Sequence, residues 1–355
     1  MYAAFLMLLC GKYLPLTAES LKMIKISVII PVYNRPEELK ELLDSLTIQH
    51  FKESTEVIVV EDGSSLTSEE AVSQFTNQLR IKYISQENAG PAAARNMGAK
   101  EAEGEYLFFF DSDCALPSDF FDKISRSVRQ GQLDCFGTKD TAHSFFSPIQ
   151  KAISYSMTSV LTTGGIRGGS KSKMDSFYPR SYSMGVRRSA FEAVGGFASM
   201  RYGEDIDLSM RLKEAGYKLG LVDDTFVYHK RRSTFRSFFK QTFCSGTARI
   251  DLAIRHNGAL KLVHMLPSIA VTVLIVLIAL SVAWSKLFLL PVVAYAILLM
   301  VDSWRKFHSL RVAMLSLWAS AIQICGYGLG FFYNAWERLV LGRKDCVVFQ
   351  KNFYK

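Results

Sequence analysis

The sequence is poor in charge and has no closely spaced pair of cysteines. Charged residues make up only 21% of its 355 residues, hydrophobic residues make up 49%, and the mean hydropathy is +0.12. A soluble domain usually has more charge and a lower hydropathy, so we expect a membrane part. No pair of the six cysteines has the CxxC spacing, which argues against a zinc site. The cysteines are also too scattered for a disulfide framework. We therefore expect free thiols in a reducing compartment.

The net charge of +9 favours an anionic partner, which is nucleic acid, a phosphate-bearing substrate or an anionic membrane surface. Many basic residues of the second half lie between 230 and 255, just before long apolar segments, and not in a patch interleaved with aromatic residues. This placement disfavours a nucleic-acid partner. The first 22 residues include an apolar stretch too short to span a bilayer and no basic region before it, so we expect a dispensable extension.

Short apolar strands alternate with helical patterns over the first 110 residues. The strands are expected at 24–33, 56–60, 81–84 and 106–110, and the helices at 36–49, 68–79 and 91–102. This alternation predicts an α/β fold with a mostly parallel sheet and crossover helices. A further helix is expected at 150–161, and a glycine-rich basic stretch at 162–173 is either a plain connection or a loop that folds over substrate.

Polar residues cluster just after the expected strands, where open α/β sheets bind ligands. Asp111 and Asp113 follow an apolar strand, and two carboxylates so close together favour a hard divalent cation such as Mg²⁺ or Mn²⁺. Taken alone, Asp-x-Asp is also common in turns. The basic run His229–Arg232 is either a phosphate clamp, through Arg231 and Arg232, or a set of residues near a membrane surface.

The succession of motifs resembles the inverting glycosyltransferases of family 2, which have the GT-A fold. The matching stretches, in order, are Ser27–Asn34, Val59–Ser64, Ala94–Gly98, Asp111–Asp113, Val194–Phe197 and Gly203–Asp205. Each motif is weak, but six in the right order over residues 24–232 are specific. The resemblance implies an enzyme that moves a sugar from a nucleotide-sugar donor to an acceptor.

The resemblance also implies roles for individual residues. Asp205 would be the general base, with Glu204 beside it, and Asp111 and Asp113 would form the metal motif, with His229 near the metal or the diphosphate. The nucleotide sugar would be bound by Pro31, Tyr33, Asn34, Asp62, Arg95 and Asp111. Processive synthases that resemble this family carry a Gln-x-x-Arg-Trp motif after the base, and the stretch from Gln241 does not match it. This departure favours transfer of a single sugar.

Three apolar segments follow, at 266–285, 287–301 and 312–336, and they predict two or three transmembrane helices. Basic residues before the first segment and around 305–311 favour a cytoplasmic catalytic domain, but three full crossings would put the basic tail on the other side. We expect an extension at 1–22, a catalytic domain at 23–255, membrane helices at 256–340 and a basic tail at 341–355.

The sequence thus predicts a multi-pass membrane enzyme whose partners are a nucleotide-sugar donor, a glycan or lipid-linked acceptor and membrane lipids. Two alternatives stay open: a non-catalytic membrane scaffold with the same fold, and a nucleotidyltransferase that activates a sugar phosphate. The latter usually has a glycine-rich phosphate loop, and none follows Ile30.

Overall fold

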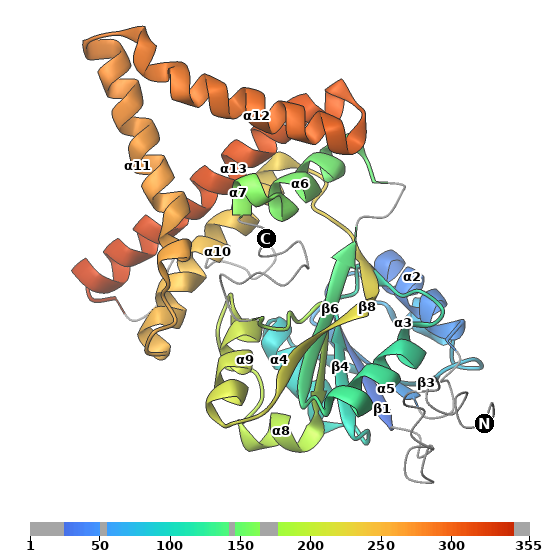
Figure 1. Ribbon diagram of the computed structural model, residues 1–355. Coiled ribbons are helices and arrows are strands. Elements are labelled where there is room, and N and C mark those ends of the chain that lie inside the picture. Colours follow the sequence, from blue (N-terminus) through green and yellow to red (C-terminus); the bar gives the residue numbers. More distant parts are fainter. Residues whose placement is uncertain (1–24, 50–54, 142–145, 164–176, 344–355) are drawn as a thin grey trace, which may run out of the picture.

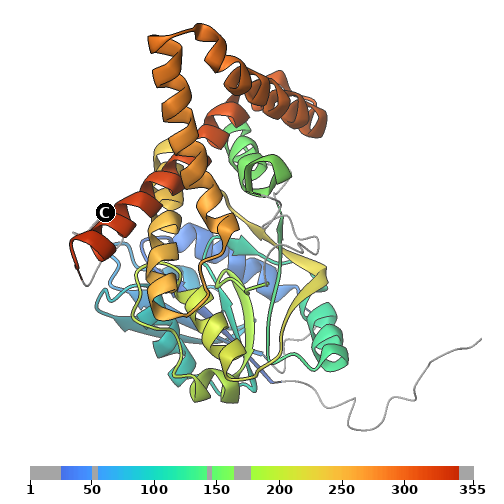
Figure 2. The ribbon, with the colours of Figure 1, turned by 60° about the vertical axis from the view of Figure 1, so that its left-hand side comes forward.

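The computed structural model describes residues 25–49, 55–141, 146–163 and 177–343 (Figure 1). The N-terminal extension, most of the glycine-rich stretch and most of the basic tail lie outside the described residues. The chain forms an α/β unit, and a group of long helices lies at one end of it (Figures 1 and 2).

One eight-stranded sheet organises the α/β unit, with the strand order β3-β2-β1-β4-β7-β6-β8-β5. Its strands are β1 (Ile26–Val32), β2 (Thr55–Asp62), β3 (Arg80–Gln86), β4 (Tyr106–Phe110), β5 (Cys114–Ala115), β6 (Cys135–Thr141), β7 (Ser183–Arg187) and β8 (Leu219–His229). The first four strands are parallel, as the sequence predicts. The second half was not predicted: β7 runs antiparallel to both β4 and β6, and β5 runs antiparallel to β8.

The strands β1, β2 and β4 are buried on both faces because helices cover each face, whereas β3, at the edge of the sheet, is partly exposed. On one face, α2 (Pro36–Thr47) packs four fully buried leucines, at 39, 42, 43 and 46, against Val28 and Ile30. Each such leucine stabilises the fold by about 1.5–3 kcal/mol. On the other face lies α4 (Pro91–Lys100), whose small residues allow a close approach. A Cβ atom at Gly98 would lie 2.5 Å from Cγ2 of Ile29.

The other helices of the α/β unit are shorter or lie at its edges. They are α3 (Glu69–Ser73), α5 (Phe120–Gly131), α6 (Pro148–Thr158), α7 (Val160–Thr163), α8 (Arg188–Ala193) and α9 (Glu204–Glu214). The predicted helix at 68–79 ends early, at Ser73, and turns follow it. The predicted helix at 150–161 is α6, which begins at a capping box between Ser147 and Gln150.

The C-terminal part consists of long helices. These are α10 (Phe235–Arg255), α11 (Leu262–Ala283), the 3₁₀ turn η3 (Lys286–Leu289), α12 (Leu290–Phe307), α13 (Leu310–Ala335) and the π-helical turn η4 (Trp336–Val340). Three segments are long and apolar enough to cross a membrane, namely Leu262–Ala283, Lys286–Phe307 and Leu310–Val340. They correspond to the three predicted apolar segments, with boundaries shifted by a few residues.

Candidate active site

The carboxyl ends of β1 and β4, the beginning of α9 and the helices α10, α11 and α13 surround one cavity of about 980 Å³. Eight of the predicted site residues line it: Pro31, Tyr33, Arg95, Asp111, Asp113, Glu204, Asp205 and Arg232. These residues come from five separate stretches of sequence, and the fold brings them to one place. Asn34, Asp62, His229 and Arg231 are not among the lining residues.

Arg95 joins two of the acidic segments. Its guanidinium lies 2.7 Å from Oδ1 of Asp111 and 3.0 Å from Oε1 of Glu204, and only 4% of its side chain is exposed. Arg95 comes from α4, Asp111 from the end of β4 and Glu204 from the first turn of α9. The ion pairs therefore tie three elements together at the cavity wall. Removing one partner of a buried ion pair costs about 3–5 kcal/mol.

Glu204 has an unusual protonation equilibrium. Burial raises the pKa of its carboxyl group to about 7, and the neighbouring charge of Asp205 adds to this rise, although Arg95 acts against it. Glu204 is thus partly protonated near neutral pH, whereas Arg95 holds it in place. A strongly shifted carboxyl group in a cavity is a common property of catalytic sites.

Asp205 lies at the cavity wall in the first turn of α9. The residue just before this helix, Gly203, is its N-cap and has a left-handed backbone (φ of 82°). Asp205 Oδ1 accepts a hydrogen bond from its neighbour's amide, that of Ile206, at 2.8 Å, and Oδ2 lies 3.4 Å from the amide of Ser181. The guanidinium of Arg180 lies 3.7 Å from Oδ1. The carboxylate is held by these contacts and still faces the cavity.

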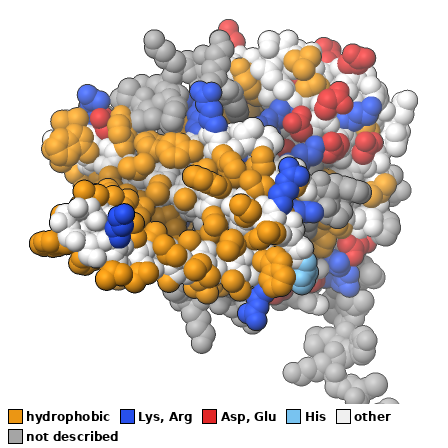
Figure 3. Space-filling model, turned by 90° about the horizontal axis from the view of Figure 1, so that it is seen from above, with side chains coloured by type: hydrophobic (Ala, Val, Ile, Leu, Met, Phe, Trp, Pro, Cys, Tyr) orange, Lys and Arg blue, Asp and Glu red, His pale blue; other side chains and the backbone are white. Residues whose placement is uncertain are grey.

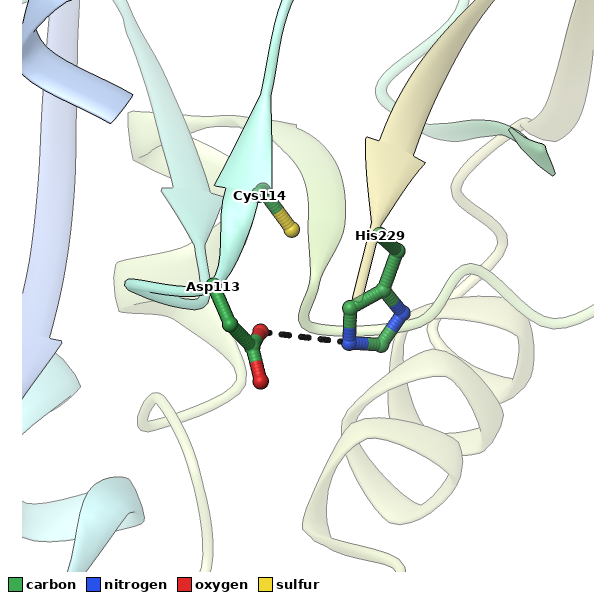
Figure 4. A group of neighbouring side chains, drawn as sticks. All are labelled: Asp113, Cys114 and His229. Carbon is green, nitrogen blue, oxygen red and sulfur yellow. Dashed lines mark ion pairs between the residues drawn. The ribbon is translucent and has the colours of Figure 1, made fainter. Parts of the chain in front are cut away.

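Asp113, just before β5, and His229, the last residue of β8, point toward one another, and Cys114 lies beside them (Figure 4). Oδ1 of Asp113 is 3.3 Å from Nε2 of His229, and Oδ2 is 2.8 Å from the guanidinium of Arg35. Burial disfavours the charged carboxylate, but His229, Arg35 and Arg232 outweigh it and hold the pKa of Asp113 well below its usual range. Asp113 is therefore a carboxylate at neutral pH.

The geometry of this pair fits a divalent cation. Two ligand atoms at about 2.1 Å from an ion and at right angles are about 3 Å apart, close to the separation of Asp113 Oδ1 and His229 Nε2. Oδ1 of Asp113 is buried, and its contact with His229 at 3.3 Å is not a well-formed hydrogen bond, so a cation between the two would satisfy it. Burial raises the pKa of the Cys114 thiol well above its usual value, which disfavours a thiolate ligand. Oxygen and imidazole ligands suit Mg²⁺ or Mn²⁺.

Other predicted site residues have partners within the protein. The carboxylate of Asp62 accepts hydrogen bonds from the amides of Ala89 and Gly90, both at 2.9 Å, and from the side chain of Gln86. Asn34 has a left-handed backbone, and its side chain accepts a hydrogen bond from the amide of Leu66. Arg231 forms a buried ion pair with Asp140 at 2.6 Å. These three residues shape the loops around the cavity, and their predicted roles toward a ligand stay predictions.

The structure adds residues that the sequence analysis did not select. Arg35 binds Asp113 and lines the cavity, and it directly follows the Tyr33-Asn34 pair that the resemblance carries. Arg180 lies near Asp205, but no local motif marks it. The far wall of the cavity includes apolar residues of the C-terminal helices, among them Pro267 of α11 and Ile324 and Tyr327 of α13. Their place depends on helix packing, which the sequence pattern does not reveal.

Comparisons with known proteins agree with this geometry. Residues 27–195 match the model of the family described as Glycosyl transferase family 2. Glycosyltransferase AglE of Haloferax volcanii is 28% identical over 257 residues, which cover 68% of this chain and 78% of that protein. The succinoglycan biosynthesis protein ExoA of Rhizobium meliloti is 25% identical over 307 residues, covering 85% and 84%.

Glycosyltransferase GlyA of Streptococcus pneumoniae is 41% identical over 111 residues, but these cover 31% of this chain and only 16% of that protein. Among solved structures, the mannosyltransferase PcManGT of Pyrobaculum calidifontis, in complex with GDP-Man and Mn²⁺, superimposes with a TM-score of 0.63. It has 18% sequence identity and covers 86% of this chain and 88% of its own. This likeness confirms the GT-A fold that the sequence predicts.

The raised pKa of Glu204 predicts a pH-dependent effect of Glu204→Gln. The carboxyl group titrates near 4.5 when exposed and at about 7 in the folded protein, so its burial lowers the stability of the wild type as pH rises between these values. The variant lacks this loss. We expect the thermal midpoint of the variant, relative to wild type, to rise from about pH 5 to about pH 7 and then to level off.

The measurement is thermal unfolding of the detergent-purified proteins over this pH range. Glu70→Gln, at an exposed position of α3, controls for the loss of one carboxylate. A difference between Glu204→Gln and wild type that does not change with pH would contradict the buried, raised Glu204.

Proposed function

We propose that this chain, a glycosyltransferase with a family 2 domain over residues 27–195, transfers a single sugar from a nucleotide-sugar donor to a glycan or lipid-linked acceptor, with inversion and with the help of a divalent metal ion. The observation that carries the proposal is the meeting of Asp111, Asp113 and Asp205 around one cavity whose far wall is apolar.

Asp113 and His229, with Asp111 at the same cavity, would hold the metal ion. Mg²⁺ or Mn²⁺ there would neutralise the charge that develops on the leaving nucleoside diphosphate, a contribution worth several kcal/mol. The GDP-Man and Mn²⁺ bound to the Pyrobaculum calidifontis mannosyltransferase support this choice of donor and metal. Arg232, on the same cavity, is a cation that the donor phosphates can approach.

Asp205 is suited to the role of general base. An acceptor hydroxyl is a weak nucleophile, and a carboxylate that takes its proton during attack contributes about 10²–10⁴-fold to the rate. One displacement of this kind at the anomeric carbon inverts its configuration. Arg180 and the amides around Asp205 fix the direction of its carboxyl group toward the cavity. Glu204 and Arg95 line the same cavity.

The far wall of the cavity supports a lipid-linked acceptor. Leu266 and Pro267 of α11 and Ile324 of α13 line it, and these helices are apolar enough to lie in a membrane. Lys240 of α10 also lines the cavity. An acceptor with an anionic group and an apolar chain would match these surfaces. We further propose that the catalytic domain faces the cytoplasm, where nucleotide sugars are made.

The metal and the donor are tested by thermal stability. The detergent-purified protein is heated with UDP or GDP, in the presence of Mn²⁺ or of a chelator. A nucleotide at about 100 times its dissociation constant should stabilise the protein by roughly 2.7 kcal/mol, and only with the metal. Asp113→Asn should lose this shift, whereas the exposed Asp223→Asn should keep it. A shift that is the same with chelator would contradict the metal site.

Asp205→Asn should separate catalysis from donor binding. The amide keeps the size of the side chain but cannot accept the proton, so we expect turnover to fall by about 10²–10⁴-fold. The nucleotide-induced thermal shift should remain. Asp44→Asn, at an exposed position of α2, is the matched control and should turn over like wild type. Turnover of Asp205→Asn near the wild-type value would exclude Asp205 as the base.

The acceptor class is tested with one glycan presented with and without a lipid chain. Each methylene group buried in the apolar wall contributes about 0.8 kcal/mol, so two of them favour the lipid-linked form by about tenfold in kcat/KM. Transfer is measured with a radiolabelled donor in detergent micelles. Equal kcat/KM for the two forms would count against a lipid-linked acceptor while leaving the transferase activity intact.

A further inference from the structure

The helix α10 lies along the catalytic domain and is fixed to it at both ends. It begins at Phe235, with Thr234 as the capping residue, shortly after the basic run that starts at His229, a proposed metal ligand. At its other end, the ring of His256 lies 3.0 Å from Asp207 and 2.9 Å from Glu214, both of which belong to α9. At 1.5 Å per residue, its 21 residues extend about 31 Å. The helix thus bridges two regions of the catalytic domain.

The last apolar helix follows α10 in parallel. The hydroxyl of Thr242 donates to the carbonyl of Ile322 at 3.3 Å, and the side chain of Asn334 donates to the carbonyl of Thr247 at 2.7 Å. Farther along, Arg338 forms an ion pair with Asp251 at 3.3 Å. The residue numbers of the contacting residues increase together on both helices. The helix α13 and the turn η4 therefore lie along α10 over most of its length.

Glycines bring the two helices into backbone contact. A Cβ atom at Gly330 would lie 2.1 Å from the carbonyl oxygen of Phe243, and one at Gly246 would lie 2.1 Å from that of Tyr327. Small residues that allow such an approach are typical of helix pairs in membrane proteins. The contact is close and extended, and it does not depend on a single ion pair.

The middle apolar segment also returns to the catalytic domain. The hydroxyl of Tyr295 donates to the carbonyl of Leu161 in α7 at 2.8 Å. Two turns later, Asp302 accepts a hydrogen bond of 2.6 Å from Tyr155 of α6. Side chains of α12 from Tyr295 onward thus contact α6 and α7, whereas most of the helix surface is exposed.

These contacts bear on how the chain meets the membrane. If α13 crossed a bilayer about 30 Å thick, α10 would have to cross beside it. However, α10 carries five charged residues, at 236, 240, 249, 251 and 255, and a charge in the hydrocarbon region is costly. The composition of α13 would allow a crossing, but its packing does not.

The apolar side chains of the C-terminal helices gather on one face of the molecule (Figure 3). In the most apolar part of α11, only 11% of the residues are buried, and the share is also 11% in the most apolar part of the η3–α12 segment. Lys and Arg side chains lie around much of the edge of this face (Figure 3). Arg305 and Arg311, which flank the turn between α12 and α13, are both exposed. An apolar surface with a basic edge fits a bilayer that contains anionic lipids.

We propose that the C-terminal helices enter the bilayer from the side of the catalytic domain and return to that side, with α13 lying along the domain at the membrane surface and not crossing. The residues after Leu341 are then on the same side as the catalytic domain. This arrangement removes the conflict of three crossings, because Arg338 and Arg343 stay with the other basic residues, as the positive-inside rule requires. It rests on the helix packing alone and not on the proposed reaction.

The side of the C-terminus is tested by labelling in sealed membrane vesicles. The full chain, with Cys10, Cys325 and Cys346 replaced by serine, receives one new cysteine, either Asp223→Cys in the catalytic domain or Leu341→Cys after η4. Both positions are exposed in the structure. We expect a membrane-impermeant maleimide to label both from the same face. Labelling of Leu341→Cys from the opposite face overturns the proposal.

The packing of α13 on α10 is tested in the same membranes by crosslinking with a short bis-methanethiosulfonate reagent. Asp251→Cys combined with Arg338→Cys places one thiol on each side of the Asp251–Arg338 contact. The reagent spans the gap left by the two shorter side chains, which is too wide for a direct disulfide, so we expect a high yield. The control pair is Asp251→Cys with Leu329→Cys, because Leu329 is exposed on the apolar face. A yield for 251 with 338 that is no higher than the control overturns the proposal, even where the labelling variants do not fold.

Discussion

The site depends on how the buried guanidinium of Arg95 balances a group of carboxylates. Asp111, Glu204 and Asp205 meet around one cavity, and in a poorly solvated place they would repel one another. Arg95 offsets this repulsion by binding two of them, and it thereby joins α4, β4 and α9. Arg35 has a similar role for Asp113. Fold stability and site geometry therefore depend on the same ion pairs.

The parallel half of the sheet could be predicted from sequence because its strands are apolar on both faces and its helices carry clear apolar stripes. The four leucines of α2 and the small residues of α4 are examples. The antiparallel half could not be predicted in the same way. The strand β8 has exposed polar residues, such as Asp223 and Asp224, within it, and β6 pairs with strands that lie far away in sequence.

Within the site, the sequence indicated which residue types are present but not their partners. The motif that contains Asp62 gave no sign that its carboxylate binds the amides of Ala89 and Gly90, because those contacts need the folded loop. Likewise, Arg95 has the sequence context of a nucleotide-binding residue, yet its two ion pairs come from segments 16 and 109 residues away. Long-range pairing of charges is not encoded in a local pattern.

The contact between α10 and α13 affects the distance between the cavity and the membrane surface. Because Gly246 and Gly330 bring backbone atoms of the two helices together, the helices cannot move closer without a clash or separate without losing the contact. The first residues of α10 follow His229, a proposed metal ligand, and α13 belongs to the apolar face. In the proposed arrangement, the helix pair would set a fixed height of the cavity carboxylates above the lipid headgroups. A fixed height would favour acceptors whose reacting hydroxyl group lies at the matching distance from the bilayer. This selection would not depend on the identity of the acceptor sugar.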